Sequence, residues 1–309
     1  MDKTILLSIA LSASLMFHAP TALAQASGDT IVVTGDRSEK EIVREYIAST
    51  ISEGPRGQYA RFDAPICPSV IGFEVDTSKF IEQRMRAVAE ASNVRTKPEG
   101  CNPNLHVVIV DDGRSAIATI RQKQKGAFGG LRPYRIDQIK RSEGPVYNWH
   151  LIKERSADNR RSRGDVGTGF NTDISKGGGP FGFLTQDRLN AGRSHIKSLV
   201  QKPVYQSMEH SFVLIEREAV LGLTPIQIAD HAIMRGLIMT TSDEESNVAV
   251  ESILGLFDAD SPFETPPDAL TRWDLALLKS LYAAPENMGS RTQRSDMILT
   301  FQKVVAAGE

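Results

Sequence analysis

The sequence predicts an α+β fold on three observations. A strongly signalled amphipathic helix spans residues 223–239, and a continuous apolar run at residues 105–110 is typical of a buried strand. Helical apolar spacing then recurs at residues 271–282 and 290–307, so helices dominate the C-terminal half. Because the strand-like runs fall mostly in the middle of the chain, we expect a mixed sheet with flanking helices and a helical C-terminal part.

The N-terminus has the pattern of a cleavable signal peptide over residues 1–24. Lys3 gives a positive start, residues 5–17 are mostly apolar, and Ala22-Leu23-Ala24 matches a cleavage site, with cleavage after Ala24. An uncleaved anchor is the alternative, but the apolar run is short for a membrane span. No later stretch reads as a membrane span either. The pattern favours a Gram-negative bacterium and a mature protein that is periplasmic or secreted.

The net charge limits the expected partners, and the cysteine content indicates a disulfide. The formal net charge is −2 at pH 7, which gives no electrostatic case for nucleic acid or an anionic membrane. Two cysteines, Cys67 and Cys101, form no C-x-x-C motif. In an oxidising compartment we expect them to form one structural disulfide, and a redox pair is the weaker reading.

The mature chain reads as one domain, residues 38–309, after a leader. Residues 25–37 suggest a flexible leader, with residues 31–34 as an alternative edge strand. Ser38 and Glu41 predict a capping box, and a second helix is expected at residues 76–94.

The middle of the chain is predicted to alternate strands with one long loop. A strand is expected at residues 146–152, and two strands at residues 200–215. Between them, residues 156–193 are rich in Gly, Arg, Asn and Ser, which predicts a flexible loop. A segment that orders on binding a partner is the alternative for this loop.

The helix at residues 223–239 is the best specified element. Thr224, Pro225 and Gln227 predict a capping box with proline in the first turn. An apolar face is expected to contain Ile226, Ala229, Ile233 and Leu237.

One acid interrupts this apolar face. Asp230 projects between the apolar side chains, whereas His231 and Arg235 are expected on the opposite side. A buried acid is costly unless it is paired or hydrogen-bonded. No Lys or Arg lies three or four residues away on that face, so Asp230 needs a partner from elsewhere in the fold.

Three stretches carry a family resemblance: Cys67-Pro68 with GCNPNLHVVIVDD at residues 100–112, QIADHAIMRGL at residues 227–237, and LTRWDLALLKSLY at residues 270–282. They resemble an uncharacterised family of exported bacterial proteins, a domain of unknown function that is distantly similar to zincin metallopeptidases. The third stretch is similar to the helix that follows the Met-turn in matrix metalloproteinases. The resemblance implies a zincin-like mixed sheet.

The same resemblance implies that the zinc-binding motif is lost. A zincin binds zinc through two His of H-E-x-x-H on one helix, with the Glu as base. If Gly236 marks the glycine after that motif, the ligand positions hold Ala229 and Ile233, Asp230 takes the base position, and Met239 the third ligand position. We therefore expect no metal and no cofactor. The other histidines of the mature chain are scattered singly, at His106, His150, His195 and His210.

These observations favour a pseudoenzyme with a binding or envelope-associated role, for which a protein partner in the envelope is expected. The alternative is a divergent, metal-independent hydrolase that uses Asp230, with His231 or Arg235, in a rearranged site. Asp111-Asp112-Gly113 ends a predicted strand, where ligand-binding acids also occur, but a strand-terminating turn is the preferred interpretation.

Overall fold

A mixed four-stranded sheet forms the centre of the protein. The computed structural model describes residues 31–33, 38–157, 201–241, 248–258, 263 and 265–307. The strand order is β2-β3-β5-β4, with bounds β2 (Pro68–Ile71), β3 (Leu105–Val110), β4 (Val146–Ser156) and β5 (Val204–Glu216). β2, β3 and β5 are parallel, and β4 pairs antiparallel with β5 at the edge. The α+β class and the mixed sheet are therefore confirmed.

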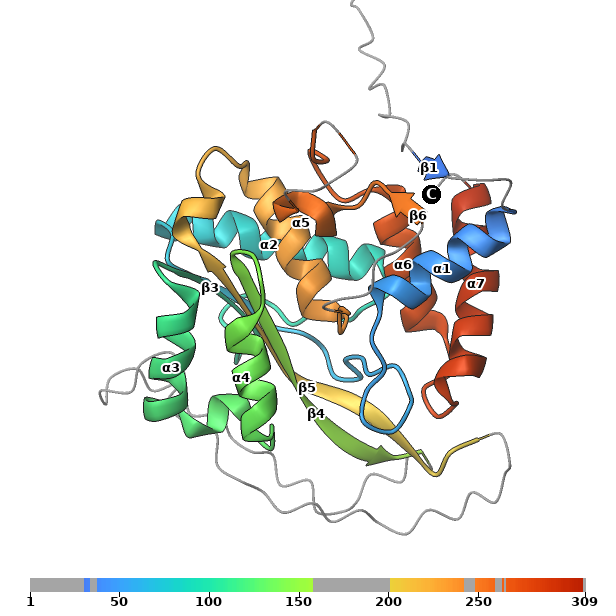
Figure 1. The fold of residues 1–309 in the computed structure, drawn as a ribbon, viewed down its shortest axis with the longest axis horizontal. Helices are drawn as coiled ribbons and strands as arrows, with labels where there is room; N and C mark the ends of the chain where they lie inside the picture. The colour runs from blue at the N-terminus through green and yellow to red at the C-terminus, as the bar shows by residue number, and fades with distance from the viewer. Residues whose placement is uncertain are drawn as a thin grey trace, which may run out of the picture.

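Helices cover both faces of this sheet (Figure 1). α2 (Val75–Ala91) and α5 (Pro225–Leu237) pack on one face, where alternate side chains of β3, such as Leu105 and Val107, join the main core. α3 (Gly113–Lys123), η1 (Lys125–Phe128) and α4 (Pro133–Arg141) cover the other face and enclose a smaller core around Val108. This alternation follows from the two-residue period of a strand.

Three further helices extend the main core beyond the sheet. α1 (Glu39–Thr50), α6 (Arg272–Ala283) and α7 (Ser290–Ala307) lie together at one side of the molecule (Figure 1). Tyr46, Trp273 and Phe301 join them through edge-to-face ring contacts, with centroids 4.9–6.0 Å apart. The predicted capping box of Ser38 and Glu41 starts α1.

Short elements complete the fold. β1 (Ile31–Val33) pairs antiparallel with β6 (Val248–Val250), which is the edge-strand alternative for the leader. Two 3-10 helices, η3 (Arg217–Val220) and η4 (Ile253–Phe257), lie on either side of α5 in the chain.

The disulfide between Cys67 and Cys101 is confirmed. Their Cα atoms are 6.1 Å apart, and the bond joins the residue before β2 to the turn before β3 across a sequence separation of 34. Closing a loop of that length stabilises the fold by about 4 kcal/mol in the chain-entropy model. A disulfide is compatible with an exported protein.

One strand prediction was wrong. The run expected as two strands at residues 200–215 is the single strand β5, and β4 pairs with it from Val204 to Ile215. The register shifts between Leu151 and Ile152, which pair with His210 and Met208, so Glu209 is an extra residue on the β5 side.

Several expectations lie outside the described residues. They are the signal peptide, its cleavage site and the predicted loop from residue 158 onward. Among the helices that are described, none is long and apolar enough to cross a membrane.

Candidate functional site

α5 is the element on which the sequence placed its candidate residues. The predicted capping box is present: Thr224 Oγ1 accepts from Gln227 N, and Pro225 occupies the first turn. Gly236 faces β3, where an added Cβ would come within 2.8 Å of Leu105 Cδ1. Glycine at this position therefore lets α5 lie close against the sheet.

The expected two-sided character of α5 was wrong. Ile226, assigned to the apolar face, is 37 % exposed, whereas His231, assigned to the opposite side, is fully buried. The sheet contacts one side of α5, and η4 packs on another, with the ring of Phe257 edge-on to His231 at 4.8 Å. A helix that is buried on most sides does not have one exposed face and one buried face.

Asp230 is fully buried and has partners from two distant segments. The guanidinium of Arg84, on α2, donates from Nε to Oδ1 and from Nη2 to Oδ2, both at 2.7 Å. The backbone N–H of Leu270 donates to Oδ2 at 2.7 Å. The hydrogen bonds between Arg84 and Asp230 raise the pKa of the Arg84 guanidinium. The partner that the sequence required for Asp230 is therefore Arg84.

His231 and Arg235 contact each other rather than Asp230. Arg235 Nε lies 3.5 Å from His231 Nε2, and Arg235 Nη1 donates to Thr240 Oγ1 at 2.9 Å. Burial lowers the pKa of His231 well below its usual value and lowers that of Arg235 to about 10. In the described part of the chain, no hydrogen bond or ion pair joins Asp230 to either residue.

The positions that the sequence resemblance would align with zinc ligands lie in the core. Ala229 and Ile233 are fully buried in the main core, and Met239 packs against it. Within the described ranges, no group of three or more His, Cys, Asp or Glu side chains is arranged to hold a metal ion.

The remaining sequence candidates have local partners. Asp112 caps α3 through Ser115 N at 2.6 Å, and exposed Asp111 pairs with Arg217 at 2.9 Å. Asp112 therefore caps a helix, and Asp111 forms a surface ion pair with η3. His106 and His210, on adjacent strands, stack with centroids 5.8 Å apart. Burial lowers the pKa of His106 to about 3 and that of His210 to about 4.

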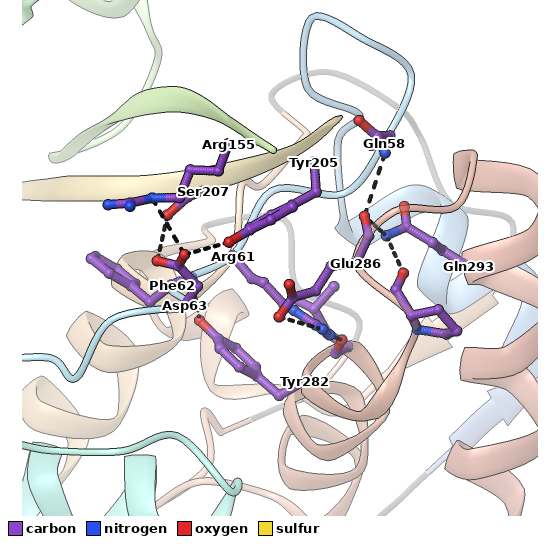
Figure 2. A network of polar contacts seen from close by, with 12 residues as sticks. Gln58, Arg61, Phe62, Asp63, Arg155, Tyr205, Ser207, Tyr282, Glu286 and Gln293 are labelled. Carbon is purple, nitrogen blue, oxygen red and sulfur yellow. Dashed lines mark hydrogen bonds and ion pairs between the residues drawn. The ribbon is translucent and has the colours of Figure 1, made fainter. Parts of the chain in front are cut away.

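Sequence reasoning missed the polar network drawn in Figure 2. It lies where the far end of the β4–β5 pair meets the segment before β2 and the α6–α7 turn. Asp63 is its centre, accepting from Tyr205 Oη at 2.8 Å and from Ser207 Oγ at 2.7 Å, with Arg155 Nε at 3.3 Å. Burial and the bond to Asp63 raise the pKa of Tyr205.

A second part of this network holds the α6–α7 turn (Figure 2). Arg61 donates to the carbonyl of Leu281 and pairs with Glu286 at 3.2 Å. Tyr282 Oη donates to the carbonyl of Leu237, the last residue of α5, at 3.2 Å. Together the two parts of the network connect the sheet, α5 and α6, so we interpret the network as structural.

An open groove of about 590 Å³ lies between α1 and α7. Lys40 and Arg44 line it from α1, and Arg291 and Arg294 line it from α7. Ile298 and Leu299 add an apolar stretch, and Glu53 supplies an acid. We call this surface the α1–α7 groove. It differs from α5 in being accessible to a ligand.

The two regions differ in what they can do chemically. A general base needs an oxygen within reach of a substrate, and both oxygens of Asp230 already accept hydrogen bonds inside the core. The α1–α7 groove can bind a ligand of opposite charge through its basic side chains.

Comparisons with protein-family models, curated proteins and solved structures find no match to this chain.

Proposed function

We propose that this chain is an exported, periplasmic protein of zincin-like descent that acts by binding, in association with the cell envelope, and not by catalysis. The descent rests on the sequence resemblance, and the export on the signal-peptide pattern of residues 1–24. The disulfide between Cys67 and Cys101 is compatible with that compartment.

The state of Asp230 is the observation that carries the non-catalytic part. Three N–H groups share its two oxygens, and the side chain is fully buried. To act as a base, Asp230 would have to leave both Arg84 and the Leu270 amide and expose itself to a substrate. That movement would break the two-point ion pair with Arg84 and the hydrogen bond from Leu270, which offset the cost of burying the carboxylate.

The alternative, a hydrolase that uses Asp230, requires a different geometry. It needs Asp230 in a cleft, with a histidine or a second acid in hydrogen-bond reach. The contacts of Asp230 are Arg84 and the Leu270 amide instead, which favours the binding role over the hydrolase.

Two measurements on the purified mature protein test the proposal. Elemental analysis should find zinc far below one equivalent, and incubation with an unfolded protein substrate should give no cleavage. Asp230→Asn, checked for folding by circular dichroism, is the control for co-purifying proteases. Stoichiometric zinc, or cleavage that the folded Asp230→Asn variant has lost, would contradict the proposal.

A further inference from the structure

We propose that the α1–α7 groove binds an acidic, partly apolar segment of a partner protein. This inference rests on the proposed binding role and names its partner class.

Four basic side chains and one acid, Glu53, line the groove walls. Lys40 and Arg44 lie one helical turn apart on α1, facing Arg291 and Arg294 of α7 across the groove. Arg294 pairs with Glu53 at 3.5 Å and also donates to Tyr59 Oη. In the part of the chain that the structure describes, the other three basic groups form no ion pair. The groove therefore offers three cations to a ligand.

Apolar surface accompanies the charges. Ile298 is buried at the groove, and Leu299 beside it is 56 % exposed. The cations are spread along two helices, which suits carboxylates on successive turns or residues of a peptide. Guanidinium groups form two-point hydrogen bonds with carboxylates, and an aliphatic side chain of the peptide can cover Leu299. A small phosphate ion would use only the charges.

Fluorescence anisotropy with a short labelled peptide of alternating Glu-Glu and Leu-Leu pairs tests the inference, at an ionic strength of about 0.15 M. We expect binding to the intact mature protein, weakened about tenfold or more in the double variant R44E/R291E. The matched control is R132E/K140E, which reverses two exposed basic groups of the α4 segment and should bind like wild type. Circular dichroism confirms that each variant is folded.

Further variants and probes separate the possible ligands. Leu299→Ser should weaken peptide binding about threefold, because it removes apolar contact but no charge. The inference is overturned if the peptide does not bind, or binds R44E/R291E as well as wild type. It is also overturned if inorganic phosphate or phosphatidylglycerol vesicles bind with the same arginine dependence and the peptide does not. These outcomes leave the zinc and cleavage measurements unchanged, so failure of the groove is distinguishable from failure of the proposed function.

Discussion

Two fully buried carboxylates hold adjacent backbone amides at the start of α6, and they do so by different means. Asp230 accepts from Leu270 N at 2.7 Å, and Asp274 accepts from Thr271 N at 3.0 Å. Asp230 has a cation, Arg84, bound to both of its oxygens. Asp274 is held by neutral groups.

The neutral groups around Asp274 come from three elements. Besides its capping partner Thr271, they are Tyr46 Oη on α1 at 3.2 Å, Ser252 Oγ, and Ile253 N at 2.9 Å on η4. Burial raises the pKa of Asp274, and the hydrogen bonds from Ile253, Ser252 and Thr271 oppose that rise. Asp274 therefore has partners in α1 and at η4 in addition to those of the α6 capping box.

The difference shows two ways to keep a carboxylate in a core. At Asp230, a single cation offsets most of the cost of burying the carboxylate. Removing that cation should therefore remove most of the stabilisation in one step. Several dipoles share the compensation at Asp274, so removal of one donor should cost only a part. Three substitutions, each with its own measurement, test this contrast.

Arg84→Met should have the largest effect. It keeps the aliphatic stem of the side chain but leaves the Asp230 carboxylate buried without its cation, so we expect a loss of about 3–5 kcal/mol in unfolding free energy. Urea unfolding followed by circular dichroism measures it.

The control for Arg84 is another arginine–aspartate pair on the surface. Arg121 binds Asp137 at 2.8 Å, with side chains 44 % and 45 % exposed, so Arg121→Met should cost at most about 1 kcal/mol. In the double variant R84M/D230L the buried charge is gone, and much of the loss should be recovered. Equal losses in the two single variants would contradict the ionic account of Asp230.

His150 extends the contrast to a buried basic group whose charged form the backbone carbonyls of Gly236 and Arg235 compensate only in part. Its Nε2 lies 3.3 Å from the Gly236 carbonyl, and burial lowers its pKa to about 4. Because the unfolded value is about 6.5, the stabilising effect of neutral His150 is complete above that pH and is lost as pH falls toward 4. This group alone should cost about 2 kcal/mol between pH 7 and pH 5.

His150→Gln keeps a side-chain N–H for the Gly236 carbonyl but does not titrate. The unfolding free energy of this variant should therefore depend less steeply on pH over the same interval, by about 2 kcal/mol. Parallel pH profiles for the variant and the wild type would show that folding does not lower the pKa of His150.

The elements that depend on neighbouring residues in the chain were predictable from the sequence. The capping boxes of α1 and α5, the strand β3 and the helix α7 follow from residues within a few positions of one another. The sequence also showed that Asp230 needs a partner. It could not name Arg84, which lies 146 positions away and reaches Asp230 only because α2 and α5 pack on the same face of the sheet.

The polar network of Figure 2 escaped prediction for the same reason. Asp63, Arg155 and Tyr205 belong to three separate segments, and none of them stands in a motif. Their association depends on the register of β4 against β5, which places Arg155 beside Tyr205. Pairing across a sheet is a tertiary property that composition and periodicity do not encode locally.

Tyr46→Phe should have the smallest effect and tests the shared compensation directly. It removes one donor to Asp274 but keeps the ring that packs edge-on against Trp273 and Phe301, with centroids 5.5 Å and 6.0 Å away. We expect a loss of about 1 kcal/mol in unfolding free energy near pH 7, measured by urea unfolding. Because the lost bond favours the charged carboxylate, this loss should shrink once acid protonates Asp274. A loss as large as that of Arg84→Met would mean that the donors around Asp274 act as one unit, and the contrast between the two carboxylates would disappear.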